Sequence, residues 1–305
     1  MKEHRVIRQK LLEGRLISVQ HLAVHPVSSA CGDIEVQETN VLALPLSGVF
    51  AKHDGPRRHV LATANDALFI RAGSLYRLSF PGCIGDQCIT LRFSTEAFAH
   101  CFPQVVKLDG INPRLFAIGV LMPSIGLLTR HLLWQRFSAG ELDDLELEEV
   151  SLNLLGSALS AAQDASHRAD RLESSVCQAA RSRQIENVKE AMSVSPERKW
   201  TLGDLASLAK VSPYHLAHVF RRDAGISVFQ YLLRTRLAAA LARMMAGETD
   251  LSRVALDVGF ASHSHFTSRF RRCFGMTPLE LRRKANAIRV TELRKIVIAQ
   301  TTVSA

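Results

Sequence analysis

A motif that occurs twice near the C-terminal end constrains this chain more than any other feature. The first copy spans residues 202–227 and the second spans residues 251–277. Their apolar and turn positions coincide on alignment, in the pairs Leu202 and Leu251, Leu205 and Val254, Ala206 and Ala255, Leu216 and Phe266, Phe220 and Phe270, and Gly225 and Gly275. Each copy predicts a short helix, a tight turn and a second helix with basic residues, which is the pattern of a helix-turn-helix unit.

Capping residues support this interpretation of both copies. In the first copy, Ser212 is a predicted N-cap, Pro213 occupies the first helical position, and Gly225 suits a left-handed C-cap. In the second copy, Gly259 provides the turn and Ser262 is the predicted N-cap. The second helix of each unit is therefore expected to begin directly after its serine.

Two further helices follow from the same signals. Residues 228–245 are rich in Ala, Leu and Arg and contain no Gly or Pro, which predicts one continuous helix between the two units. Thr277 and Pro278 predict the cap and first residue of a last helix. We expect the long helix to set the spacing of the two units.

The positive charge of the chain is concentrated in the same region. The 305 residues carry a formal net charge of +9, and residues 181–290 contain 19 Lys and Arg against 9 Asp and Glu. A localised basic surface is typical of phosphate binding. Packed helices with no nucleic-acid role are the alternative, and the localised charge argues against them.

On these residues the chain resembles the AraC/XylS family of bacterial transcription regulators. The motifs that carry the resemblance are HL-x3-F-RR-x2-G at residues 215–225, GF at 259–260, SHF at 264–266, FRR-x-FG at 270–275 and TP-x3-R at 277–282, with Tyr231, Arg236, Ala240 and Leu241. The resemblance covers residues 181–284. It implies that each second helix enters one of two successive major grooves of double-stranded promoter DNA, and that RNA polymerase is a partner.

By position, the resemblance also implies which side chains meet DNA. In the first unit these are Tyr214, Ala217, His218, Arg221 and Arg222; in the second they are His263, Ser264, Thr267, Ser268, Arg269, Arg271 and Arg272. The five arginines are expected mainly at phosphates, which position the protein without specifying sequence, and they cannot all face DNA at once. Ala217, His218 and Ser268 replace the Gln or Arg of some well-studied members, so the operator cannot be inferred from relatives.

The first part of the chain has a different pattern. Short β-prone segments recur at residues 34–39, 41–50, 59–62, 68–71, 76–80 and 88–93, with turn signals between them. This predicts a small barrel or sandwich. Residues 66–93 resemble the cupin-like sensor domain of many family members. The expected fold class is therefore α+β with two domains: a cupin-like β-barrel with a helical segment, and an all-α domain of two helix-turn-helix units.

The expected domain boundaries follow from these patterns. They are a cupin-like sensor domain at 1–110, a helical dimerisation or interdomain segment at 111–165, a linker at 166–182, the DNA-binding domain at 183–290 and a tail at 291–305. In the helical segment, the apolar positions Leu142, Leu145, Val150, Leu152, Leu155 and Leu159 form either core or a homodimer interface. No apolar run is long enough for a membrane span and no signal peptide is apparent, which predicts a cytoplasmic, nucleoid-associated protein.

The role expected of the barrel is to bind a small effector or to mediate dimerisation. The candidate effector-binding residues are Phe69, Arg71, Tyr76, Arg77 and Arg92, each of which could equally belong to the core or the surface. A cupin could also be a metalloenzyme. However, His53 and His59 are the only histidines of the expected strand region, no His-x-His occurs there, and no Glu lies at a matching distance. No cofactor, metal or catalytic residue is predicted.

Cysteine and histidine spacing adds two weaker points. The chain has six scattered cysteines, of which Cys83 and Cys88 flank strand ends and could form a thiol sensor, although buried bystander cysteines are commoner. His263 and His265 are two residues apart on a helix and should point to different faces, so a shared metal is not expected.

The sequence therefore predicts a sequence-specific DNA-binding transcription regulator, an effector-responsive activator of nearby genes, and not an enzyme. Two alternatives remain open. One is a small-molecule cupin metalloenzyme with a helical appendage. The other is an architectural DNA binder without sequence preference.

Overall fold

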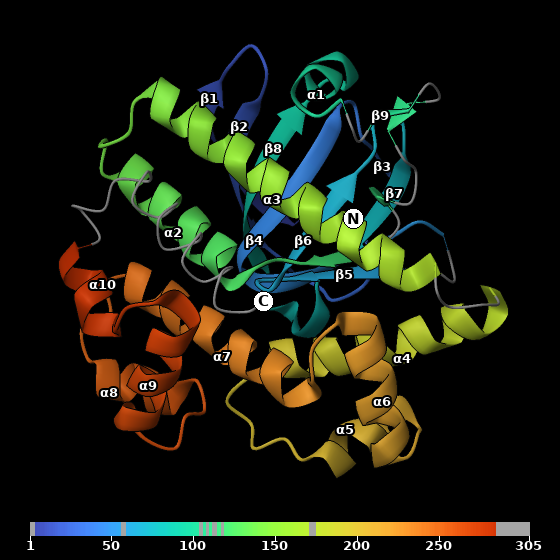
Figure 1. Ribbon diagram of the computed structural model, residues 1–305, viewed down its shortest axis with the longest axis vertical. Coiled ribbons are helices and arrows are strands. Elements are labelled where there is room, and N and C mark those ends of the chain that lie inside the picture. Colours follow the sequence, from blue (N-terminus) through green and yellow to red (C-terminus); the bar gives the residue numbers. More distant parts are fainter. Residues whose placement is uncertain are drawn as a thin grey trace.

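The computed structural model describes residues 4–55, 59–103, 106–107, 110–111, 115–116, 119–170 and 175–284. A strongly curved sheet forms the first part of the chain and helices form the second (Figure 1), which confirms the α+β prediction. The strands are β1 Arg5–Glu13, β2 Ser18–His25, β3 Glu35–Val36, β4 Asn40–His53, β5 His59–Thr63, β6 Asp66–Ile70, β7 Leu75–Ser79, β8 Asp86–Phe93, β9 Val106–Lys107, β10 Gly110–Ile111 and β11 Gly119–Leu121. The α-helices are α1 Thr95–Cys101, α2 Ser124–Ser138, α3 Asp144–Asp170, α4 Ser175–Val194, α5 Leu202–Ala209, α6 Pro213–Ala224, α7 Val228–Met245, α8 Leu251–Asp257, α9 His263–Phe274 and α10 Pro278–Lys284.

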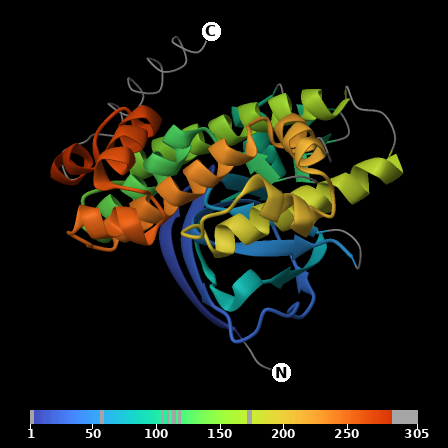
Figure 2. The same ribbon diagram turned by 90° about the horizontal axis from the view of Figure 1, so that it is seen from below.

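The sheet is antiparallel and is organised around the long strand β4. Its main path runs β1-β2-β8-β4-β6-β11, and the second half of β4 also pairs with β5 and β7. A bulge between Pro45 and Ser47 shifts the register of β4 against β8. Bulges bend strands, which lets β4 belong to both halves of the curved sheet seen in Figure 2. Gly48 follows the bulge with φ +78°, where an added Cβ would lie 2.0 Å from the Gly85 carbonyl oxygen.

The sheet extends beyond the range that the sequence predicted. Strands β1 and β2 precede residue 33, where the β pattern was expected to begin, and β11 pairs with β6 beyond the boundary at residue 110. The first six residues of β1 are exposed, so the strand has little apolar alternation to reveal it. In β2, His21 occupies a buried position, which hides the alternation there. His21 and His25 therefore also lie on strands, in addition to His53 and His59.

Helices α2 and α3 cover one face of the sheet (Figure 1). Leu147, Val150 and Leu155 of α3 are buried against it in one hydrophobic cluster, whereas Leu145 is 77% exposed. Most of the apolar stripe expected on this segment is therefore core. Helices α3 and α4 both extend into residues 166–182, the expected linker, because that polar range contains no Gly or Pro to end a helix. The tail at 291–305 lies outside the described residues.

The helical domain has the predicted units. Helices α5 and α6 form the first, α8 and α9 form the second, and α7 joins them over the predicted residues (Figure 1). One hydrophobic cluster combines the first unit with α4 and the first half of α7. A second cluster combines the second unit with the rest of α7 and with Leu128 and Leu132 of α2. Helix α2 therefore belongs both to the helices that cover the sheet and to the core of the second unit.

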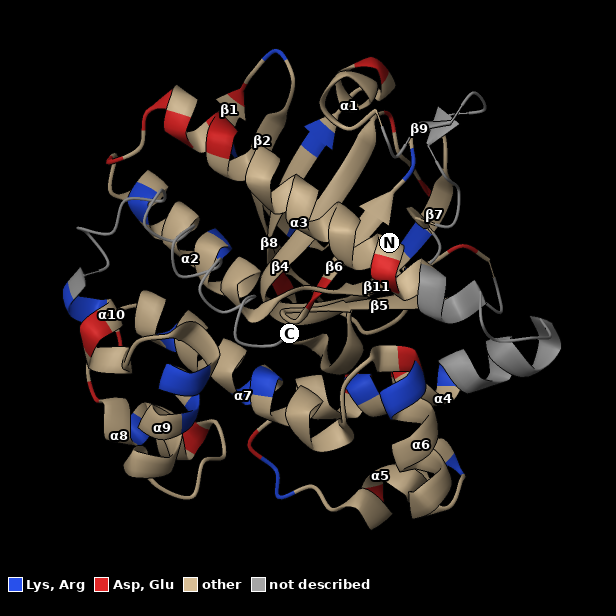
Figure 3. Cartoon of the chain, viewed as in Figure 1, with Lys and Arg blue, Asp and Glu red and all other residues tan. Residues whose placement is uncertain are grey.

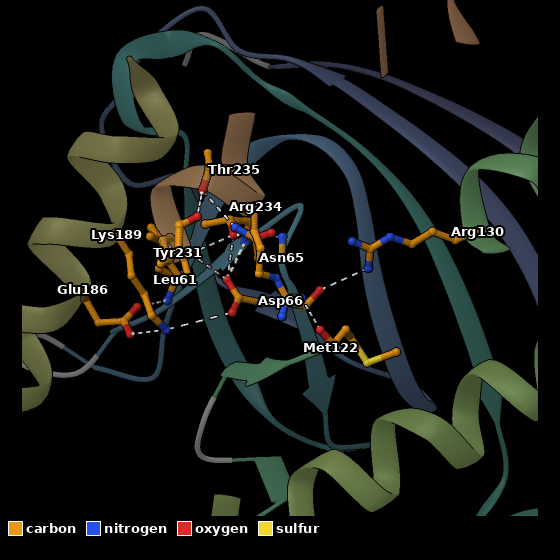
Figure 4. Close-up of polar contacts among 11 residues, drawn as sticks. Leu61, Asn65, Asp66, Met122, Arg130, Glu186, Lys189, Tyr231, Arg234 and Thr235 are labelled. Atoms are coloured by element: carbon orange, nitrogen blue, oxygen red, sulfur yellow. Dashed lines mark hydrogen bonds and ion pairs between the residues drawn. The ribbon is translucent and has the colours of Figure 1, made fainter. Parts of the chain in front are cut away.

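A buried polar network joins the sheet to the helical domain (Figure 4). At its centre, the carboxylate of Asp66 on β6 accepts hydrogen bonds from the hydroxyls of Thr63 (2.7 Å) and of Tyr231 on α7 (3.3 Å). The Nζ atom of Lys189 on α4 lies 3.9 Å from the other Asp66 oxygen. The amide of Asn65 donates to the Thr235 hydroxyl at 2.9 Å. These contacts attach α4 and α7 to the end of the sheet.

Two further facts bear on the function classes considered above. Among the described residues, no helix is both long enough and apolar enough to cross a membrane. Within the same part of the chain, no group of three or more His, Cys, Asp or Glu side chains is arranged to hold a metal ion. His53 and His59 are direct cross-strand partners with ring centroids 5.5 Å apart, and His53 Nε2 is hydrogen-bonded to Ser79 at 2.8 Å.

Gly259 shows how closely the second unit packs. It has φ +94°, and an added Cβ would lie 2.8 Å from backbone atoms of Glu197. Gly247 has the same φ, but nothing lies within 4 Å of its added Cβ. We expect Gly247→Ala to lower the free energy of unfolding by about 1 kcal/mol through backbone strain alone. Gly259→Ala should cost roughly 2–4 kcal/mol because the clash adds to the strain. Equal losses in urea denaturation would show that the contact with Glu197 is unimportant.

Candidate nucleic-acid interface

Both second helices begin and end at the predicted caps. The Ser212 hydroxyl accepts a hydrogen bond from the His215 backbone N–H, and the Ser262 hydroxyl accepts one from the His265 N–H, both at 3.2 Å. Gly225 and Gly275 end the helices with φ +77° and +78°. Because these signals are local, α6 and α9 have the same length and the same placement of their basic residues in the last turn.

Helix α6 presents most of its candidate side chains to solvent. Its core face, led by Leu216 and Phe220, is buried in the first unit. Tyr214 is 84% exposed, His218 and Arg221 are exposed, and Ala217 is half-buried. A tyrosine ring so exposed contributes little to the fold, which makes it available to a partner.

Arg222 is placed differently from the other candidates on α6. Its Nε atom donates to the Asp223 carboxylate at 2.6 Å, and both side chains are half-buried. Part of its charge is therefore already neutralised within the protein. Arg221, one residue earlier and exposed, is the freer cation of this unit.

Helix α9 forms one wall of an open groove of about 610 Å³. The lining residues are His263, Ser264, Thr267, Ser268, Arg271, Arg272 and Thr277. Six of these seven were predicted to contact DNA, and their spacing places them on one face of α9. Thr277 was expected only as a helix cap. Its position two residues after the Gly275 C-cap of α9 was the signal in the sequence that it adjoins the groove.

Arg269 lies away from this groove. Its Nε atom donates to His265 Nε2 at 3.2 Å, and the His265 ring contacts Phe260 edge-on at 5.6 Å. Arg269 and His265 therefore support the turn between α8 and α9. By contrast, Arg271 and Arg272 are exposed, and neither takes part in an ion pair within the described part of the chain. His263 lines the groove while His265 does not, in agreement with their expected separation.

The charges are distributed unevenly over the fold (Figure 3). Lys and Arg residues occur on α6, α7 and α9, whereas acidic residues occur at the start of α3. The two helix-turn-helix units lie at opposite ends of α7 (Figure 1). Several arginines of α7 are occupied internally: Arg234 donates to the Met122 carbonyl, and Arg243 pairs with Glu248 and Asp257, both at 2.7 Å. Among the candidate DNA-binding arginines, Arg221, Arg271 and Arg272 are exposed and take part in no ion pair within the described residues.

The candidate effector residues are not gathered into one site. Phe69 is fully buried in the cluster beneath α3, whereas Tyr76 belongs to a different hydrophobic cluster and donates to Glu35 and Gln37, each at 3.2 Å. Arg71 and Arg77 are exposed, and Arg92 is half-buried and donates to Thr39 at 3.2 Å. Neighbouring residues of a strand point to opposite faces, so closeness in sequence did not bring these side chains together.

The two cysteines considered as a thiol sensor differ in exposure. Cys83 is exposed, but Cys88 is buried on β8, and burial raises the pKa of the Cys88 thiol well above its ordinary value. A thiol with a raised pKa is a poor nucleophile. Cys88 therefore lacks the exposure and the low pKa that a reactive sensor thiol requires.

Comparison with known proteins identifies the second part of the chain. Residues 205–284 match the family described as a helix-turn-helix domain. A putative AraC-like transcription regulator of Streptomyces lividans is 36% identical over 88 residues, which is 29% of each chain. The HTH-type transcriptional regulator GlxA of Rhizobium meliloti (strain 1021) is 33% identical over 100 residues, which is 33% of this chain and 31% of that protein.

A solved structure also matches part of the chain. The crystal structure of a DNA-binding transcriptional dual regulator from Escherichia coli K-12 is 29% identical, covers 33% of this chain and 91% of that chain, and has a TM-score of 0.32. The chain thus aligns with about three tenths of the length of the curated relatives. The resemblance stated from the sequence is confirmed for the helix-turn-helix region.

Proposed function

We propose that this protein is a sequence-specific DNA-binding transcription regulator of the AraC type. The observation that carries the proposal is the groove along α9, whose wall combines hydrogen-bonding side chains with two exposed arginines that form no ion pair with any described residue. Side chains such as His263 and Ser264 suit base edges, and Arg271 and Arg272 suit phosphates. The equivalent positions of α6 hold Tyr214, Ala217, His218, Arg221 and Arg222, so the same division of tasks applies there.

The spacing of the units supports contact with two successive grooves. Helix α7 has 18 residues, so its length is about 27 Å. Successive major-groove segments on one side of B-DNA are about 34 Å apart. Units attached at the two ends of α7 are therefore separated by a distance comparable to one helical turn. An architectural binder would need the arginines but not the polar side chains at the start of each helix.

The remaining parts of the proposal are regulatory. The protein binds promoter DNA in the cytoplasm, in association with the nucleoid, contacts RNA polymerase, and activates nearby genes in response to a small effector. A homodimer would double the number of DNA segments read. In this role the protein binds rather than catalyses. The relatives named as transcription regulators support it, although they align with only 29% and 33% of this chain.

Selection of binding sites from a random duplex library tests the proposal, with purified full-length protein at physiological salt. We expect enrichment of sites that contain two short conserved blocks about one helical turn apart. Binding that depends on salt but enriches no sequence, with and without extracts containing candidate effectors, would favour the architectural alternative.

Single substitutions should then separate the two blocks. Tyr214→Ala is expected to relax base preference within one block, and His263→Ala within the other, because the two residues lie on different second helices. The loss should be about 1–3 kcal/mol at the affected base pairs and near zero elsewhere. Repeating the selection with each variant measures this. A matched control is Arg253→Ala on α8, whose side chain is 75% exposed and absent from the groove. Unchanged preferences in both variants would show that these residues do not read bases.

A further inference from the structure

A second cavity lies between the sheet and the helical domain, away from the α9 groove. Its volume is about 420 Å³, within the range of small-molecule sites, which often occur at domain interfaces. The sheet contributes Leu46 and Asn65, α2 contributes His131 and Trp134, and α7 contributes residues from Thr235 to Ala246. A molecule bound here would touch both domains at once.

Two residues that line the cavity have buried hydrogen-bonding atoms without a partner among the described residues. The first is Asn65, which is 1% exposed and whose Oδ1 atom accepts no hydrogen bond there. The orientation of this amide is determined by Thr235, whose hydroxyl donates to the Tyr231 carbonyl (3.0 Å) and therefore accepts from Asn65 Nδ2 (2.9 Å). Asn65 Oδ1 is thus an acceptor in need of a donor. Leaving such a buried atom unpaired is costly.

His131 supplies a second acceptor. It is 2% exposed, and its Nδ1 atom is hydrogen-bonded to the Leu127 carbonyl at 2.9 Å, which places the ring proton on Nδ1. Burial lowers the pKa of His131 to about 3, so the ring is neutral at physiological pH. The ring also interacts with the backbone of Leu46, and its Nε2 atom has no hydrogen-bond partner within the described residues. Both buried acceptors therefore suit a ligand that donates hydrogen bonds.

The remaining walls favour an uncharged ligand with an apolar body. Apolar surface comes from Trp134, Ala239, Ala242 and Met245, among others. The charged lining residues, Arg243 and Glu248, pair with each other at 2.7 Å. A charged ligand would therefore find no free counter-charge among the lining residues and would lose its hydration on entry.

We infer that this interdomain cavity is the effector site, and that it binds a small uncharged molecule with an apolar body and a hydroxyl or N–H donor. Its regulatory meaning rests on the proposed function: a ligand that bridges the sheet and α7 stabilises this arrangement of the domains and so changes how the two units meet DNA. The site differs from the residues that the sequence suggested for an effector.

Three matched probes test the chemistry: 2-naphthol, 2-methoxynaphthalene and 2-naphthoate. They share an apolar body but offer, in turn, a neutral donor, no donor and a negative charge. With full-length protein and no DNA, ligand-observed NMR titration should give 2-naphthol an affinity roughly five- to tenfold above the other two. Equal affinities, or tightest binding of 2-naphthoate, would overturn the inference.

Two variants locate the donor contact. Asn65→Ala should abolish the preference for 2-naphthol over 2-methoxynaphthalene. Thr235→Ser is the matched control, because it changes the partner of Asn65 but keeps the hydroxyl that orients Oδ1, and it should retain the preference. The ratio of two affinities does not depend on small losses of stability. A preference retained by Asn65→Ala would contradict the assignment.

A third variant, Ala242→Phe, fills the cavity and should reduce 2-naphthol binding at least tenfold; unchanged binding by the folded variant would place the probe elsewhere. Binding of the probes and selection of duplex sites are separate measurements. Probe binding without sequence selection would support the ligand site and refute the proposed function. Sequence selection without donor-dependent probe binding would support the proposed function and refute the ligand site.

Discussion

Replacing Arg271 and Arg272 together with alanine is expected to weaken binding to every duplex by roughly 10- to 100-fold at physiological salt. Both side chains line the α9 groove and are exposed. Arginines that contact phosphate release counterions from DNA, so each lost contact should reduce the slope of log affinity against log salt by about 0.9. The double variant should therefore lower the slope by about 1.8 while leaving base preference unchanged.

Fluorescence anisotropy with a selected duplex and a scrambled duplex, over a range of salt concentrations, measures both effects. Arg253→Ala is the control for loss of positive charge outside the groove, and it should change the slope little. Arg269→Ala adds a second comparison, because Arg269 is bonded to His265 and faces away from the groove. An unchanged slope in the double variant would show that the α9 groove does not bind the DNA backbone.

Replacing Asp66 with alanine is expected to lower the free energy of unfolding by about 3–5 kcal/mol, because it removes one of the two carboxylates that pair with buried Lys189 and the acceptor of the Thr63 and Tyr231 hydroxyls. Asp66 is fully buried and lies 3.9 Å from Lys189. Burial by itself lowers the pKa of Lys189, but the carboxylates of Glu186 and Asp66 outweigh it and raise that pKa above its ordinary value. Lys189 therefore stays charged in the folded protein and needs both carboxylates.

A double variant tests this explanation. Adding Lys189→Met to Asp66→Ala should cost less than the two single losses together, because the Asp66–Lys189 interaction is lost only once. Tyr231→Phe, which deletes one hydroxyl hydrogen-bonded to Asp66, should cost only about 1–2 kcal/mol. Urea denaturation followed by circular dichroism gives these values, together with that of Lys189→Met alone. Losses that simply add in the double variant would show that Asp66 and Lys189 are not coupled.

These contacts also explain why Asp66→Ala should affect the whole molecule. The network joins β6 to α4 and α7, so its loss weakens the attachment between the sheet and the helical domain (Figure 4). We expect the single unfolding transition to broaden or to divide into two. The interdomain cavity shares Asn65 and Thr235 with this network, which places the proposed effector beside the contacts that hold the domains together.

The sequence by itself determined the helical domain almost completely. Serine caps, glycine C-caps and the period of apolar residues act within a few positions of the chain, so the boundaries of α6, α7 and α9 could be predicted from it. The resemblance to the AraC/XylS family named six of the seven residues that line the α9 groove, whereas Thr277 was expected only as a helix cap. It also placed Arg269 among the DNA contacts, but the hydrogen bond to His265 holds that side chain away from the groove.

Only the tertiary structure decided what depends on residues far apart in the chain. Strand β1 is mostly exposed and exists because it pairs with β2; helix α2 is shared between the sheet and the second unit because its buried face meets both. Asp66 and Tyr231 are 165 residues apart, and no local sequence pattern predicts their contact. The interdomain cavity arises from the same long-range packing. Local backbone preferences depend on neighbouring residues in the sequence, whereas burial and polar pairing between domains depend on the whole fold.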